Sequence, residues 1–261
     1  MKIPLYQIDA FTDRLYHGNP AAVCPLDKWL LDETMQAIAA ENNLSETAFY
    51  VKADEGFHIR WFTPLTEVDL CGHATLATAH VLYNHLGFSG DKITFTSRSG
   101  LLKVKRDEDF IVLDFPVDDY HPAEAPPELI QGLGLEPQES YLGKTDFMLV
   151  YRSQIDIERL TPDFGLIAKA PSRGIIVTAP GDEYDYVCRI FAPQVGINAD
   201  PATGSVQTTL TPYWANRLGK TELTAVQLSQ RRGWLKCKLV GDRVYIAGQA
   251  VTYLVGKIEV S

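Results

Sequence analysis

The sequence predicts an α+β protein made of two similar lobes, each with antiparallel strands around one central helix. Two observations predict this fold: a set of motifs that occurs twice in the same order, and one segment in each half that is apolar on nearly every helical face. The chain also contains no G-x-G-x-x-G or Walker sequence and no regular strand–helix alternation, so a Rossmann fold is disfavoured.

The repeated motifs keep their spacing as well as their order. A glycine follows the leading glycine of each central helix after 15 residues in both halves. The alternative is chance similarity between two strand–helix–strand units, which four matches in one order disfavour. The matches, first half against second half, are residues 60–64 and 189–193, Gly72 and Gly204, Gly87 and Gly219, and residues 100–105 and 233–238.

The apolar periodicity sets the expected elements. A helix that is apolar all round is a buried helix, and Gly87 and Gly219 are expected to end the two central helices in the left-handed conformation. Segments that alternate with period two are expected to be antiparallel strands. The expected helices are 32–42, 75–86, 128–134 and 206–218, and the expected strands include 92–95, 101–105, 110–115, 243–246 and 251–258.

The boundary between the lobes is expected in residues 118–127, which are rich in proline and acidic residues and lack apolar periodicity. This boundary gives an N-terminal lobe of residues 1–117 and a C-terminal lobe of residues 118–261, with an exchange of strands at the lobe ends allowed.

Composition excludes several classes of function. The net charge of −9 and the lack of a Lys/Arg cluster argue against a nucleic-acid surface. No apolar run has membrane-spanning length and the first residues lack a signal-peptide pattern, so we expect no membrane partner and a cytoplasmic location. The four cysteines form no C-x-x-C motif and have no histidine at ligand spacing, so we expect neither a metal site nor disulfides.

The starts of the two central helices are candidates for an anion site. The first amides of a helix lack internal partners and carry partial positive charge, so two such starts meeting in the cleft between the lobes would bind a small carboxylate. The loops concerned are residues 69–74, with Cys71, Gly72 and His73, and residues 200–205, with Asp200, Gly204 and Ser205. The alternative is that Asp200 and Ser205 only cap their helix.

Glu46 is the candidate general acid or base. It precedes an apolar strand, and a partly desolvated carboxylate has a raised pKa that suits proton transfer. The alternative is an ordinary exposed glutamate on an edge strand. His73 is expected to be neutral because the positive end of the helix dipole lowers its pKa, and the alternative is a capping or core histidine.

These motifs resemble the PhzF-like family (phenazine-biosynthesis isomerase-like proteins), which shares the diaminopimelate-epimerase fold. The resemblance covers nearly the whole chain and includes residues 7–12, 18–23 with Asn19, 44–49, 60–64, 71–75 and 200–205. It implies two pseudo-symmetric lobes, each an antiparallel β-barrel around one helix, with the active site between them.

The resemblance also implies a reaction and roles. It implies a cofactor-independent isomerase in which Glu46 moves a proton between carbons of a small cyclic or amino-acid-like carboxylate. His73, Asp200 and Ser205 match residues that line the family site, and the amides at Gly72 and Gly204 would hold the substrate carboxylate. Cys71 and Asn19 are expected neighbours of the site, and a homodimer is the expected assembly.

One segment departs from the family pattern. Many members carry a Gly-x-x-x-Gly-Arg-Pro-like sequence late in the chain, where this chain has Leu228–Trp234.

Two other functions stay open. A two-cysteine epimerase or racemase would use Cys71, but Thr203 or Pro201 stands at the opposite position and neither is a base. A protein that binds small molecules without turnover is the second.

Overall fold

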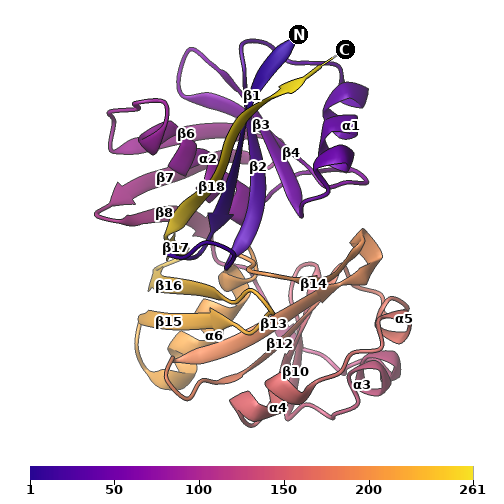
Figure 1. The fold of residues 1–261 in the computed structure, drawn as a ribbon. Helices are drawn as coiled ribbons and strands as arrows, with labels where there is room; N and C mark the ends of the chain where they lie inside the picture. The colour runs from indigo at the N-terminus through magenta and orange to yellow at the C-terminus, as the bar shows by residue number, and fades with distance from the viewer. Residues whose placement is uncertain (261) are drawn as a thin grey trace. The chain divides into compact units, whose positions relative to one another are not determined.

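The structure is a computed structural model that describes residues 1–260, and it divides into two compact units. The first unit contains residues 1–115 and 245–261, and the second contains residues 116–244. The sequence analysis assigned 118–261 to the C-terminal lobe and allowed an exchange of strands at the lobe ends. Residues 245–261 instead belong to the first unit, because β18 (Ala250–Glu259) pairs antiparallel with β1 (Lys2–Ala10) (Figure 1).

The first unit consists of a mixed sheet and two helices. The expected helix at 32–42 is confirmed as α1, and the expected helix at 75–86 is α2, shifted toward the N-terminus. Besides β1 and β18, the elements are β2 (Asn19–Leu26), α1 (Asp32–Asn42), β3 (Glu46–Lys52), β4 (Phe57–Phe62), β5 (Glu67–Val68), α2 (Gly72–Asn84), β6 (Lys92–Ser97), β7 (Gly100–Asp107), β8 (Phe110–Pro116) and β17 (Arg243–Gly248), the last two carrying the chain across the unit boundary.

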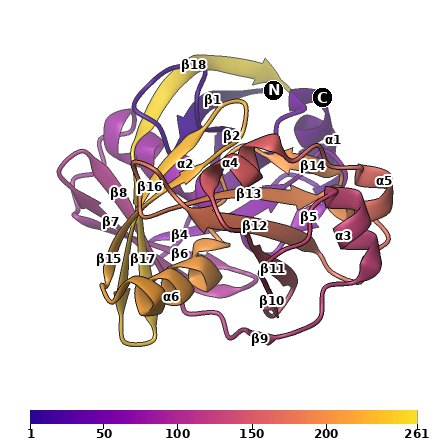
Figure 2. The ribbon, with the colours of Figure 1, turned by 90° about the horizontal axis from the view of Figure 1, so that it is seen from below.

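The second unit has one long helix, α6, and three short ones, of which α3 packs against α5 (Figure 2). Its elements are β9 (His121–Pro122), α3 (Pro127–Leu133), β10 (Glu139–Leu142), β11 (Asp146–Val150), α4 (Gln154–Arg159), α5 (Phe164–Ile167), β12 (Gly174–Pro180), β13 (Tyr186–Ala192), a 3₁₀ turn (Pro193–Val195), β14 (Ile197–Asp200), α6 (Gln207–Leu218), β15 (Glu222–Gln227) and β16 (Gly233–Val240).

The two units repeat one strand-pairing scheme, as the duplicated motifs predict. In the first unit β2 pairs with β3, β3 with β4, β4 with β5 and β6, and β6 with β7. In the second unit β11, β12, β13, β14, β15 and β16 pair in the same sequence. The α+β class and the duplication are therefore confirmed.

The expectation of purely antiparallel strands is wrong in detail. Each unit contains two parallel pairs: β2 with β3 and β4 with β6 in the first, and β11 with β12 and β13 with β15 in the second. The reason is connectivity. A helical segment lies between the two strands of each parallel pair, and a helical crossover returns the chain in its original direction, which a tight hairpin cannot do.

Helix α2 is the buried centre of the first unit. It begins at Gly72, the leading glycine of the repeated motif, and packs against β1, β2 and β3. Most of its side chains are buried, and its buried hydroxyls bond back to the helix, as Thr78 Oγ1 does to the carbonyl of Ala74 at 2.7 Å. Gly87 has the expected positive φ of 67°, although the helix already ends at the cap residue His85.

Helix α6 is the counterpart in the second unit and packs against β15 and β16 (Figure 2). It begins at Gln207, three residues after the expected glycine, because Gly204–Val206 form a turn. Gly219 ends it in the left-handed conformation with φ 66°, which confirms the predicted cap. No helix within residues 1–260 is both long and apolar enough to span a membrane.

Candidate active site

Three predicted site residues form one buried row in the first unit. The Nε2 atom of His73 lies 3.2 Å from Oε2 of Glu46, and its Nδ1 atom lies 3.4 Å from Sγ of Cys71. The side chains of His73 and Glu46 are only 5% and 11% exposed, and Cys71 is also buried. The row therefore joins a carboxylate, an imidazole and a thiol away from bulk water.

Local structure brings these residues together. Glu46 is the first residue of β3 and is in register with Ala21 of the parallel strand β2. Cys71 is the extended cap residue of α2, and His73 is the second residue of the helix. Because α2 packs against both β2 and β3, the start of the helix meets the start of β3. Asn19, also fully buried, begins β2.

Burial decides the charge of the imidazole. It lowers the pKa of His73 to about 3, because the charged ring would lose its hydration. His73 is therefore neutral at physiological pH, as the sequence predicts, but burial rather than the helix dipole is the main cause. The alternative of an exposed edge-strand Glu46 is wrong, since Glu46 is buried beside this ring.

This lowered pKa predicts acid lability. When the chain unfolds, the pKa of His73 returns to about 6.5, so below that pH the unfolded state binds a proton that the folded state excludes. The contribution of His73 to stability is complete above pH 6.5 and is lost as the pH falls toward 3. We expect the free energy of unfolding to fall by about 2 kcal/mol between pH 7 and pH 5 through this residue, as measured by urea unfolding.

Two variants test the assignment. His73→Gln should flatten this pH dependence, whereas His58→Gln, which alters an exposed histidine of β4, should leave it unchanged. His80 contributes in the same direction, because burial lowers its pKa to about 4. Equal pH dependence in the wild type and in His73→Gln would contradict the prediction.

One donor atom from each of the three residues of the row lies within 4.8 Å of the others. A bound ion would need one ring nitrogen next to both the sulfur and the carboxylate. In the structure the two ring nitrogens face different partners, the sulfur on one side and the carboxylate on the other. The imidazole thus lies between the thiol and the carboxylate.

Three other predicted residues lie close together along the second unit: Asp200 ends β14, and Gly204 and Ser205 follow it in the loop that leads to α6. Asp200 is buried, and its carboxylate accepts a hydrogen bond from the Thr203 hydroxyl. The alternative that Asp200 and Ser205 only cap α6 finds no support, because the start of α6 has no side-chain cap.

A buried glutamine that the sequence analysis missed holds this loop. The Gln227 amide donates to the carbonyl of Asp200 at 2.6 Å and to the Thr203 hydroxyl at 3.1 Å, and its oxygen accepts from the Thr203 amide at 2.8 Å. The signal was present in β15, where Leu223, Ala225 and Gln227 alternate on one face. A polar residue in line with two buried apolar ones indicates a partner in the core.

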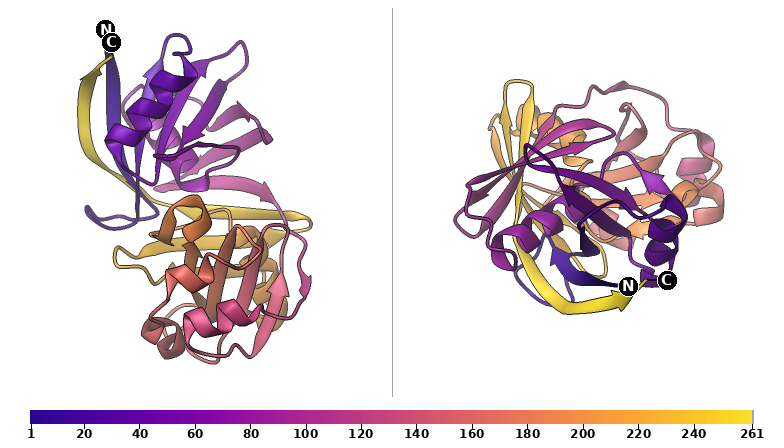
Figure 3. Two further views of the ribbon diagram at one scale, coloured as in Figure 1. Left: turned by 90° about the vertical axis from the view of Figure 1, so that its right-hand side faces the viewer. Right: turned by 90° about the horizontal axis from the view of Figure 1, so that it is seen from above.

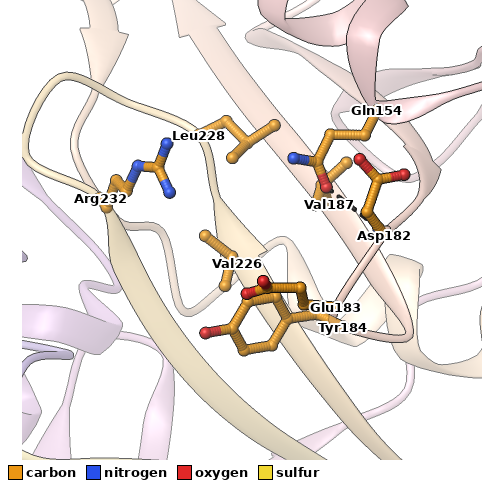
Figure 4. Close-up of a pocket in the computed structure, with 8 residues that line it drawn as sticks. All are labelled: Gln154, Asp182, Glu183, Tyr184, Val187, Val226, Leu228 and Arg232. Carbon is orange, nitrogen blue, oxygen red and sulfur yellow. Dashed lines mark hydrogen bonds between the residues drawn. The ribbon is translucent and has the colours of Figure 1, made fainter.

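The segment Leu228–Trp234, which departs from the family pattern, borders a cavity of the second unit. Figure 4 shows Arg232 facing this cavity from one side and Asp182 with Gln154 from the other, over apolar side chains. The cavity has a volume of about 200 Å³ and is lined by Gln154, Asp182, Glu183, Tyr184, Val187, Val226, Leu228 and Arg232. None of the predicted site residues lines it.

Comparison with known proteins identifies the family of the chain. Residues 8–256 match the PhzC-PhzF family, described as phenazine biosynthesis-like protein. An uncharacterised isomerase of Pseudomonas aeruginosa is 51% identical over 264 residues, which cover all of both chains. A crystal structure of a phenazine biosynthesis protein of the PhzF family from Enterococcus faecalis is 44% identical, covers all of both chains and has a TM-score of 0.96.

A more distant structure extends the likeness of the fold. A hydroxyproline epimerase from Agrobacterium vitis has a TM-score of 0.64 at 10% identity, and the match covers 98% of this chain and 92% of that one. The epimerase-like fold that the sequence predicts is therefore confirmed. Given the match along residues 8–256 and the curated relative named an isomerase, the chain belongs to the PhzC-PhzF family of phenazine biosynthesis-like proteins and is an isomerase.

Proposed function

We propose that this isomerase moves a proton between carbon atoms of a small cyclic or amino-acid-like carboxylate, with Glu46 as the acid and base. The observation that carries the proposal is the buried pair of Glu46 and the neutral imidazole of His73, whose atoms lie 3.2 Å apart. A carboxylate with such a partner can take a proton from carbon and return it, which are the two steps that an isomerisation by proton transfer requires.

The proposed reaction balances without a cofactor. Glu46 accepts a proton from one carbon and the electron pair of the broken C–H bond moves into the substrate. The proton on Glu46 can exchange with solvent between the two steps, and the protonated Glu46 then delivers a proton to a second carbon, so no electrons leave the substrate. Before the first step, Nε2 of His73 would donate a hydrogen bond to the ionised carboxylate of Glu46 and so orient it.

We propose that the carboxylate of the substrate binds at the helix starts. The first amides of α2, at Gly72 and His73, and those of the turn at Gly204 and Ser205 are suited to a carboxylate, because such amides have no acceptor within their own helix. Asp200 would orient a polar group of the substrate. A homodimer and a cytoplasmic location stay predictions.

A two-thiol mechanism receives no support from the cysteines of the second unit. Burial raises the pKa of Cys188 to about 12 and that of Cys237 to about 11, so both stay protonated at physiological pH. Cys188 lies within β13 and Cys237 within β16, where both are fully enclosed. Neither thiol has the thiolate character that a base needs.

Isotope exchange tests the proposal. The purified chain would be incubated in D₂O with a panel of small cyclic and amino-acid-like carboxylates, and deuterium at carbon would be followed by NMR and mass spectrometry. We expect catalysed incorporation into at least one member of the panel. Saturable binding of a panel member without incorporation would instead favour a protein that binds small molecules without turnover.

A further inference from the structure

The sulfur of Cys71 is the part of the buried row that the proposed proton transfer does not use. Building on the function proposed above, we propose that Cys71 is a positioning residue: its thiol donates a hydrogen bond to Nδ1 of His73 and thereby holds the imidazole in the Nε2–H form that donates to Glu46. The distances on the two sides of the ring are 3.4 Å to sulfur and 3.2 Å to the carboxylate.

The donor direction follows from counting protons. A neutral imidazole carries one N–H, so one ring nitrogen donates and the other accepts. An ionised Glu46 can only accept, which requires the proton on Nε2. The bare Nδ1 then faces Cys71, which must supply the S–H of that contact.

One other arrangement has the same number of protons. In it the thiol proton has moved to Nδ1 and the Nε2 proton has moved to Glu46, which leaves a thiolate and a neutral carboxylic acid. Both arrangements carry one negative charge. A thiol is a weaker acid than a carboxyl group by about four pH units, so the charge belongs on Glu46. Both residues are buried to a similar degree, so burial does not reverse this order.

The hydrogen bond from sulfur acts on Glu46 through the ring. A donor at Nδ1 polarises the imidazole and makes Nε2–H a better donor, because linked hydrogen bonds strengthen one another. The better donor stabilises the ionised form of Glu46. Loss of the thiol should therefore raise the pKa of Glu46 and loosen the orientation of the ring.

Other titratable groups stand on the elements packed around this row, and none of them differs between the wild type and a Cys71 variant. They are Tyr6 and Asp9 of β1, Cys24 of β2, Tyr50 of β3, and His80 and Tyr83 of α2. The carboxylate of Asp9 accepts a hydrogen bond from the amide of Tyr16 at 2.8 Å. A difference between wild type and a Cys71 variant thus reports on the sulfur alone.

The first measurement is made on the wild type and needs no Cys71 variant. In ¹⁵N NMR of histidine-labelled protein the protonated and bare ring nitrogens have distinct shifts, and His73→Gln assigns the signals. We expect Nε2 protonated and Nδ1 bare at pH 7. A proton on Nδ1 would overturn the proposal, and this result stands even if a Cys71 variant fails to fold.

The second measurement is the pKa of Glu46 from ¹³C NMR of its carboxyl group, assigned with Glu46→Gln. Cys71→Ala should raise this pKa by about half a pH unit, since the hydrogen bond it removes is a weak one. Cys71→Ser should restore the wild-type value because its hydroxyl also donates. Cys24→Ala, which removes another buried thiol of the same unit, is the matched control and should change nothing.

The outcomes separate this proposal from the proposed function. An unchanged pKa of Glu46 in Cys71→Ala would overturn the role of the sulfur and leave the isomerase proposal intact. If the wild type shows no deuterium incorporation but has the expected tautomer and pKa shift, the proposed reaction is wrong. The role of Cys71 as a positioning residue then stands. In an active protein, the acidic limb of the pH profile should shift with the pKa of Glu46.

Discussion

Replacing Glu46 with glutamine should lower the rate of deuterium incorporation by about 10²- to 10⁴-fold, the range that a positioned acid or base contributes. Glutamine has nearly the same shape, and its carbonyl can still accept from Nε2 of His73, so the row keeps its packing. It cannot take up a proton from carbon. The measurement is exchange in D₂O with a substrate identified from the panel, and substrate affinity should change much less than the rate.

The control is Glu41→Gln, the same chemical change at an exposed position of α1. This variant should exchange at the wild-type rate. A Glu46→Gln protein that folds and retains exchange within tenfold of wild type would show that another group carries the proton.

Replacing Gln227 with leucine should destabilise the loop that holds Asp200 by about 3 kcal/mol. The substitution removes three hydrogen bonds and leaves the carbonyl of Asp200 and the amide of Thr203 without this partner in a buried place. Hydrogen exchange at the Thr203 amide should then speed up on the order of 100-fold, because that amide reports the opening of this loop alone. Substrate affinity should fall with it.

Two further variants sharpen the result. Gln227→Glu keeps an acceptor for Thr203 but loses the donor to Asp200, so the loop should loosen in part. Gln131→Leu, on the exposed face of α3, makes the same exchange of amide for apolar side chain and should leave the loop unchanged. Unaltered protection of the Thr203 amide in Gln227→Leu would mean that Gln207, whose amide donates to the Thr203 carbonyl at 3.2 Å, is sufficient to hold the loop.

The duplicated motifs predicted the elements better than the pairing of the strands. Helix α1 has its expected bounds, and α2 and α6 lie within three residues of theirs at each end. Local periodicity contains that information. Whether β2 lies parallel to β3 depends on how the chain returns after α1. The residue pattern within either strand does not predict this direction.

The site shows a similar limit. Residue type and position singled out Glu46, Cys71 and His73, but the sequence could not show that a sulfur and a carboxylate flank the same ring, because side-chain geometry comes from the packing of α2 on β3. The network around Gln227 was missed for a related reason. Its partners Asp200 and Thr203 lie more than 20 residues away along the chain, so only the folded loop reveals the contact.

The return of β18 to β1 bears on how the chain folds as the ribosome makes it. Both termini lie at one end of the same unit in each view of Figure 3, and the backbone of Val260 bonds to that of Met1. Residues 116–244 are synthesised before residues 245–261, so β1 has only β2 as a strand neighbour until the last residues of the chain are made. The unit made first along the chain is thus the last to be completed.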